Sequence, residues 1–277
     1  MVIKKLSILL LAVVLSSCLT FTQADNGKDS SPVAVTKEES FTEETSKDSN
    51  HSVPEKSEPV EEIPVPEEEN VKMIFTLEGR YLGELKEGKK DGYGVFYWNN
   101  GERYEGEWKE GKRHGYGKYY WENGDYYEGE WQNDLMHGQG TYHMANGDKY
   151  TGEWRNGFMH GEGEYVWENG DVYRGEWANG QKWGYGVFRS SDGDVYEGEW
   201  AHDSMNGKGT YTWSDGDRYE GEWRNGLMHG RGIFYIAHGG RYEGEFKNGR
   251  ATGGWYYLPE GDRRRAYMDS EGQWMIE

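Results

Sequence analysis

The sequence predicts an all-β protein, an elongated single-layer antiparallel meander of repeated β-hairpins. Three observations predict it. A sequence unit recurs every 23 residues, two runs within each unit alternate with a period of two, and pairs of turn-forming residues separate these runs. The composition suits a thin sheet, since only 34% of the 277 residues are hydrophobic while 16% are aromatic and 42 are glycine. Burial must come from rings more than from aliphatic side chains.

A tyrosine marks each of the eight units. It is followed two positions later by Gly, three later by Glu, and four later by Leu85, by one of six tryptophans, or by Phe246. The marker tyrosines are Tyr81, Tyr104, Tyr127, Tyr150, Tyr173, Tyr196, Tyr219 and Tyr242. Self-similarity at a short fixed period is typical of solenoids and repeat arrays.

Alternation within a unit predicts one hairpin. In the seventh unit Tyr219, Gly221 and Trp223 point one way and the residues between them point the other way. A return run from Gly230 to Ile236 alternates in the same manner. Eight such units predict about sixteen short strands that pair in sequence order, roughly 75 Å from end to end at about 4.8 Å per strand.

Asn-Gly pairs are expected at both kinds of turn, because Asn and Gly tolerate the positive φ angles of tight hairpins. Four pairs follow the first strand of a unit: Asn156-Gly157, Asn179-Gly180, Asn225-Gly226 and Asn248-Gly249. Four follow the second strand: Asn100-Gly101, Asn123-Gly124, Asn146-Gly147 and Asn169-Gly170.

Two tryptophan columns are predicted on the face that carries the tyrosines. One column contains Trp108, Trp131, Trp154, Trp177, Trp200 and Trp223, and the other contains Trp98, Trp121, Trp167 and Trp213, with Met144, Ser190 and Ile236 at its interruptions. Glycines recur on the same face, where a ring can lie over them. We interpret the columns as core, and any ring left uncovered would be a contact surface.

Residues 1–17 are expected to be an export signal. Two lysines precede an apolar run at residues 6–15, which is about half the length needed to span a bilayer as a helix. The run ends in Leu-Ser-Ser-Cys, which resembles the bacterial lipobox and implies lipid attachment at Cys18, the single cysteine. An ordinary secretory signal is the alternative. Because Leu19 and not Asp follows, the resemblance implies the outer membrane in a diderm cell.

Residues 18–72 are expected to be a disordered, lipid-anchored linker. Residues 19–70 contain five of the six prolines, no Trp or Tyr, and four lysines against fourteen acidic residues, a net charge of −10. This composition cannot form a core, and its charges extend the chain. A docking role for the acidic run is the alternative.

One string recurs most clearly at residues 150–163 and 219–232: Tyr-x-Gly-Glu-Trp-x-Asn-Gly-x-x-His-Gly-x-Gly. It resembles the MORN repeat, named for membrane occupation and recognition nexus. The resemblance implies an elongated β array with a scaffolding or interaction role, sometimes with self-association, and no catalytic residues. The repeat-defining positions include Tyr104, Gly106, Glu107, Trp108, Tyr150, Gly152, Glu153, Trp154, Tyr219, Gly221, Glu222 and Trp223.

The ends of the array, placed at residues 73–256, depart from the pattern. The first unit has Leu85 for Trp, and the last has Phe246 and places Trp255 where the second Gly of Gly-x-Gly is expected. We expect Pro259 to stop the second tryptophan column and residues 257–277 to fold over the last strand as a cap. Arg263, Arg264 and Arg265 in this cap are interpreted as solvated, with phosphate binding as the alternative.

Polar columns give no catalytic or metal site. The unit glutamates, Glu84, Glu107, Glu130, Glu153, Glu176, Glu199, Glu222 and Glu245, should lie opposite the rings, and we interpret them as acceptors for turn amides or partners of Lys and Arg. The recurring histidines, His114, His137, His160 and His229, are about 9 to 10 Å apart at the backbone if they lie on adjacent hairpins, too wide for a standard zinc site. We expect no metal and no cofactor.

These features predict a non-catalytic, membrane-tethered interaction or scaffolding module of the bacterial cell envelope. Its partner would be an envelope protein or a second copy of the chain. A net charge of −19 argues against nucleic acid. The alternative is a module that binds envelope carbohydrate or a choline-bearing polymer through exposed aromatic columns.

Overall fold

The computed structural model describes residues 71–277. The predicted signal peptide, Cys18 and all but the last two residues of the predicted linker lie outside this range. Within residues 71–277 every element is a strand, which confirms the all-β prediction. This part of the chain accordingly contains no helix that is long and apolar enough to cross a membrane.

Nineteen strands follow one another along the described chain. They are β1 (Lys72–Phe75), β2 (Gly79–Lys86), β3 (Lys89–Trp98), β4 (Arg103–Lys109), β5 (Lys112–Tyr120), β6 (Tyr126–Gln132), β7 (Leu135–His143), β8 (Lys149–Arg155), β9 (Phe158–Val166), β10 (Val172–Ala178), β11 (Gln181–Arg189), β12 (Val195–Ala201), β13 (Ser204–Thr212), β14 (Arg218–Arg224), β15 (Leu227–Tyr235), β16 (Arg241–Lys247), β17 (Arg250–Tyr257), β18 (Arg263–Met268) and β19 (Trp274–Ile276).

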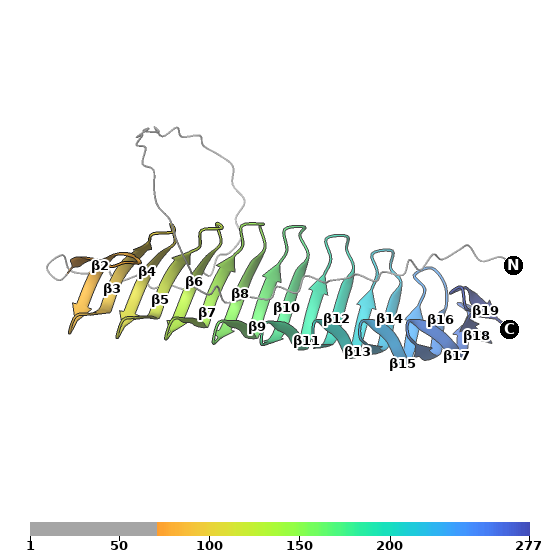
Figure 1. The fold of residues 1–277 in the computed structure, drawn as a ribbon. Coiled ribbons are helices and arrows are strands. Elements are labelled where there is room, and N and C mark those ends of the chain that lie inside the picture. The colour runs from red at the N-terminus through yellow and green to blue at the C-terminus, as the bar shows by residue number, and fades with distance from the viewer. Residues whose placement is uncertain (1–70) are drawn as a thin grey trace, which may run out of the picture. The chain divides into compact units, whose positions relative to one another are not determined.

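Each strand pairs antiparallel with the next one in the sequence, from β1–β2 to β18–β19, so the described residues form one open meander (Figure 1). The sixteen strands predicted from the repeats are β2 to β17. The other three extend both ends. β1 pairs with β2 ahead of the first tyrosine, and β18 and β19 continue the sheet beyond β17.

The turn within each hairpin has two residues, and both have positive φ. In the fourth unit these are Asn156, with φ 51°, and Gly157, with φ 84°. Positive φ at both positions is the type I′ geometry that matches the twist of paired strands, as the Asn-Gly pairs predict. His202 and Asp203 adopt the same conformation in the sixth unit, with φ of 50° and 63°.

The turn between hairpins works differently, and the prediction for its asparagines was wrong. At Asn100-Gly101 only the glycine has positive φ, and its N–H donates to the carbonyl of Trp98. The Asn100 side chain instead accepts a hydrogen bond from the backbone N–H of Glu102 at 3.1 Å. Asparagine is favoured here as a side-chain acceptor that closes the turn.

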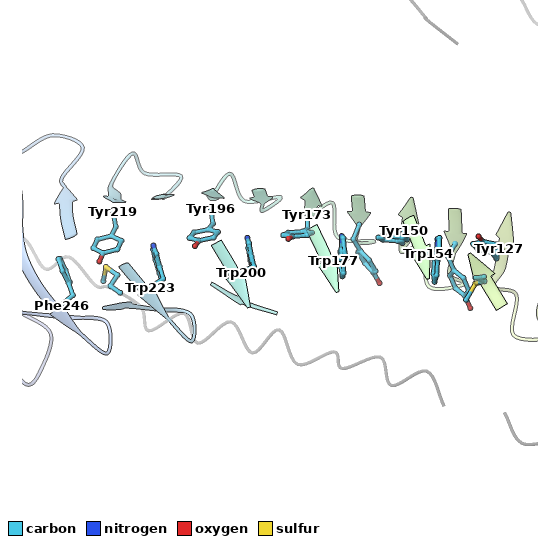
Figure 2. Close-up of a cluster of buried hydrophobic side chains, with 14 of the residues drawn as sticks. Tyr127, Tyr150, Trp154, Tyr173, Trp177, Tyr196, Trp200, Tyr219, Trp223 and Phe246 are labelled. Carbon is cyan, nitrogen blue, oxygen red and sulfur yellow. The ribbon is translucent and has the colours of Figure 1, made fainter. Parts of the chain in front are cut away.

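The core is a row of rings on one face of the sheet, here called the inner face. All eight marker tyrosines are 0% exposed, and the six tryptophans that follow them are 3% to 5% exposed (Figure 2). Tyr104 illustrates how the tyrosines fit: its ring lies over Gly106 on its own strand and Gly117 on the paired strand. A side chain at either glycine would occupy the space of the ring.

The last unit is one residue shorter than the period assumes, and two predictions there were wrong. Gly254, not Trp255, takes the position of the second glycine, because it pairs with Gly244 as Gly232 pairs with Gly221. Leu258, not Pro259, therefore follows Ile236 in the second tryptophan column and packs on the core. The proline lies in the following turn, and the sheet continues into β18.

Candidate functional site

Tyrosine and tryptophan rings alternate along the inner face. Tyr150 meets Trp154 of its own hairpin and Trp177 of the next one edge to face, with centroids 5.1 and 5.4 Å apart. The same two contacts recur from Tyr104 to Tyr196, and Figure 2 shows the row from Tyr127 to Phe246. Edge-to-face pairs add about 0.5 to 1.5 kcal/mol beyond area burial, so the row ties each hairpin to the next.

Hydrogen bonds fix the rings in this arrangement. Each tryptophan of the row donates its indole N–H to a glycine carbonyl in the preceding hairpin at 3.0 to 3.3 Å. Each marker tyrosine donates its hydroxyl to the carbonyl of the glutamate three residues later. Burial raises the pKa of these phenols above their ordinary value, so they stay neutral donors.

The glutamates of the column accept backbone hydrogen bonds, but the donors lie in the return strand and not in a turn. In each of the first seven units, Oε1 of the glutamate accepts a hydrogen bond from the backbone N–H of the residue nine positions later, at 2.7 to 3.2 Å. Glu107 therefore binds the amide of Tyr116, and its carboxylate fills the space beside Gly115, whose φ is 57°. These carboxylates are engaged in holding the return strand.

An aspartate column, which the sequence analysis missed, joins neighbouring hairpins. Asp148 accepts from the Tyr165 hydroxyl at 2.9 Å and from the backbone N–H of Glu168 at 2.8 Å. Asp125 and Asp194 do the same in their units. The available signal was an Asp directly after the turn glycine, repeated every 23 residues.

The predicted repeat-defining residues come together within each hairpin. In the fourth unit the inner face carries Tyr150, Gly152 and Trp154, and the opposite face carries Glu153. The second unit and the seventh follow the same arrangement, with Tyr104, Gly106 and Trp108 on the inner face in the second. Cys18, the predicted lipid site, lies outside the described residues.

Three cations interrupt the inner face at a position where other units place Met136, Met159, Met205, Met228 or Ala251. They are Lys90, Arg113 and Lys182. The Lys182 side chain is 4% exposed, and its Nζ lies 4.8 Å from the ring centre of Trp200 and 5.3 Å from that of Trp167. Burial lowers the pKa of Lys182 to about 8, against a smaller opposing effect of Asp203.

The opposite face, here called the outer face, differs from unit to unit. The residue after each marker tyrosine is, in order, Leu82, Glu105, Glu128, Thr151, Arg174, Glu197, Glu220 and Glu243. The middle residue of Gly-x-Gly in the first seven units is Tyr93, Tyr116, Gln139, Glu162, Tyr185, Lys208 and Arg231. These side chains are half-buried or exposed, so at these positions the outer face varies from unit to unit, while the tyrosine row of the inner face is the same in every unit.

A shallow groove of about 570 Å³ lies on the outer face across β11 to β15. Tyr185 forms one end of it and Arg231 the other, with Lys208 and Thr210 between them. Tyr185 is 51% exposed, and its hydroxyl donates a hydrogen bond to Glu197 at 2.7 Å, which fixes the ring at the groove.

A second groove of about 450 Å³ continues from Arg231 across β14 to β17. Ile233, Trp255 and Tyr257 line it together with three glutamates. Trp255 carries two guanidinium groups on its ring, those of Arg263 and Arg265, at 4.5 and 5.4 Å from the ring centre.

The recurring histidines do not form a cluster. Nδ1 of His137, His160 and His229 is buried and has no hydrogen-bond partner among residues 71–277. No group of three metal-ligating side chains converges anywhere in that same part of the chain.

Comparison with known proteins identifies the repeat. The family model described as MORN repeat matches eight consecutive segments, residues 81–103, 104–126, 127–149, 150–172, 173–195, 196–218, 219–241 and 242–263. No curated protein matches the chain.

Solved structures with similar strands are distant. The TCP domain of SAS-4 (dCPAP) of Drosophila melanogaster, solved with a proline-rich motif of Ana2 (dSTIL), is 11% identical over 79% of this chain and 97% of that one, with a TM-score of 0.32. The G-box domain of the microcephaly protein CPAP is 10% identical over 75% and 98%, with a TM-score of 0.25. These scores support no inference about this chain.

The eight matched segments cover the sheet from Tyr81 in β2 to the first residue of β18, with one tyrosine-marked hairpin in each. The chain is a repeat module and belongs to the MORN repeat family.

Proposed function

We propose that this protein is a non-catalytic interaction module that is tethered to a bacterial envelope membrane through Cys18 and binds a protein partner on its outer face. The observation that carries the proposal is the difference between the two faces. The inner face repeats the buried tyrosine in every unit and the buried tryptophan in six of the eight, whereas the half-buried or exposed side chains of the outer face differ from unit to unit. A face that is free of the packing requirement is available for recognition.

The outer grooves support a protein partner in particular. Both grooves are open to solvent and run across several adjacent strands. Their lining combines Tyr, Trp and Arg with acidic side chains. Tyr, Trp and Arg are the residues that most often dominate protein interfaces.

Affinity capture from envelope extracts tests the proposal. The tagged chain should enrich a specific protein, and the outer-face variant Tyr116→Ser/Tyr185→Ser should lose it. The matched control Phe158→Ser/Leu227→Ser removes two exposed side chains beside hairpin turns and should keep it. The interaction proposal fails if no protein is enriched over the tag alone, or if both double variants capture as the original chain does.

The tether is tested separately by Cys18→Ala. The chain should move from the membrane fraction to the soluble fraction, because two or more acyl chains are needed for stable anchoring and the variant has none. Retention of the variant in the membrane fraction would mean that the array or the export signal holds the membrane. In a diderm cell, we propose the outer membrane as the anchoring membrane.

Envelope carbohydrate or a choline-bearing polymer is the second candidate ligand. The tyrosine column and the first tryptophan column are buried, and the second tryptophan column is half-buried. Such a ligand would therefore use the more exposed rings, of which Trp183 and Tyr185 are 42% and 51% exposed. Retention of the purified chain on peptidoglycan or a choline resin, lost in Trp183→Ala/Tyr185→Ala, would favour this candidate over a protein partner.

A further inference from the structure

The negative charge of the array is concentrated in its first part. Residues 71–217 contain sixteen Lys and Arg against twenty-seven Asp and Glu, a net charge of −11. Residues 218–265 contain nine against six, a net charge of +3, and residues 266–277 add three acidic residues and no cation. The segment with an excess of cations coincides with the outer-face groove of β14 to β17.

The carboxylates of this groove are already paired. Glu220 forms an ion pair with Arg218, Glu243 with Arg241, and Glu245 with Arg231. Each of these three arginines is thereby neutralised locally.

Arg263 and Arg265 are different. Neither has a carboxylate partner within residues 71–277, and both guanidinium groups are held on the Trp255 ring at the edge of the groove. Tyr257 and Ile233 add apolar surface beside them. The structure thus places two unpaired, pre-positioned cations next to an aromatic and aliphatic groove, which fits an acidic peptide that also carries apolar residues.

We propose that the occupant is residues 58–69 of a second copy of this chain. Their sequence, Glu-Pro-Val-Glu-Glu-Ile-Pro-Val-Pro-Glu-Glu-Glu, contains six glutamates, no cation, and three aliphatic residues among three prolines. Proline favours extended conformations, in which the aliphatic side chains can face the groove while the carboxylates meet the arginines.

The contact must be between copies. Twelve fully extended residues span at most about 43 Å. They join the sheet at β1, and β17 lies sixteen strand steps further on, roughly 77 Å at about 4.8 Å per step. Binding therefore joins the beginning of one array to the far end of another, head to tail. This inference names a partner for the proposed interaction surface and rests on that proposal.

Sedimentation velocity of the purified soluble Cys18→Ala chain at increasing concentration tests the inference. The chain should associate, and association should weaken at least tenfold in Arg263→Ser/Arg265→Ser. The matched control Arg224→Ser/Arg250→Ser removes the same charge from the same end of the sheet and should stay within twofold. A synthetic peptide of residues 58–69 should dissolve the assembly, whereas a peptide with all six glutamates changed to glutamine should not.

Three results would overturn the inference: a chain that stays monomeric, equal association of the two double variants, or a glutamine peptide that competes as well as the original. A different outcome is that the chain binds phosphatidylglycerol vesicles through Arg263 and Arg265, with no competition from the peptide. That result would assign the two arginines to an anionic lipid surface and also overturn the inference. Because only purified chain is used, these results are independent of partner capture by Tyr116 and Tyr185. Unchanged circular dichroism of each variant confirms that it has folded.

Discussion

The indole nitrogen of Trp154 donates a hydrogen bond to the carbonyl oxygen of Gly140, 3.2 Å away in the preceding hairpin. The same ring is held edge to face between Tyr127 and Tyr150. One side chain thus provides both a polar and an aromatic link between successive repeats. Because this geometry recurs through six units, the stability of the array depends on links between neighbours and not on a thick core.

Trp154→Phe separates the two kinds of link. An aromatic ring is kept, although a smaller one, and the indole N–H is lost, so we expect a loss of about 2 kcal/mol in the free energy of unfolding, against about 3 to 5 kcal/mol for Trp154→Ala. Urea denaturation measures both. Trp183→Phe changes an exposed ring and should have almost no effect. Equal losses for Trp154→Phe and Trp154→Ala would show that the hydrogen bond, not the ring, dominates.

Gly117→Ala tests the contact between ring and glycine. A methyl group there would overlap the Tyr104 hydroxyl and lie 2.6 Å from its Cζ, so we expect destabilisation of about 1 to 3 kcal/mol. Gly253→Ala is the matched control, because nothing lies within 4 Å of the added carbon. Similar unfolding midpoints for the two variants would contradict the proposed role of the rings.

Lys182→Met should stabilise the array at pH 7 by up to about 3 kcal/mol, the free energy that corresponds to its shifted pKa. The folded-state pKa of about 8 lies below the unfolded value, so the unfolded chain binds more protons between them. The stability that Lys182 costs is therefore recovered as the pH rises from about 8 to about 10. Urea denaturation at pH 7 and pH 10 should show the advantage of the variant shrinking. A constant advantage would mean that packing, not charge, is the cause.

Asp148→Ala should cost more stability than Asp171→Ala. Each of these aspartates accepts a backbone N–H of the next turn, but only Asp148 also accepts a tyrosine hydroxyl, because Phe188 occupies that position beside Asp171. The difference should be about 1 to 2 kcal/mol in the thermal or urea unfolding of the two variants. If both cost the same, the phenol contributes nothing and the aspartate acts through the backbone alone.

The repeat period and alternation were sufficient to predict the hairpin meander, the two faces and the burial of the tyrosine column and the first tryptophan column, whereas the second tryptophan column is only half-buried. Those features follow from local spacing that every unit shares. The role of Asp148 was not predictable from spacing alone, since its two donors, Tyr165 and Glu168, lie 17 and 20 residues away and meet it only when hairpins stack.

Errors arose where one residue changes the register or where a residue type has two uses. A single missing residue in the last unit puts Leu258 at the position that a strict period assigns to Pro259. The strand pairing of β16 with β17 reveals this shift, and the sequence alone does not. Asn100 and Asn156 are followed by the same residue, yet one accepts a hydrogen bond and the other adopts positive φ. The number of residues between the strands decides which role applies.

Coupling between Tyr150 and Trp177 is the most direct test of the account, because these rings belong to neighbouring hairpins and lie 5.4 Å apart at 84°. A double-mutant cycle with Tyr150→Leu and Trp177→Leu, measured by urea unfolding, should give a coupling energy of about 0.5 to 1.5 kcal/mol. The cycle of Tyr150 with the distant Trp223 should give almost none. Additive effects for Tyr150 and Trp177 would contradict the conclusion that alternating rings hold the repeats together.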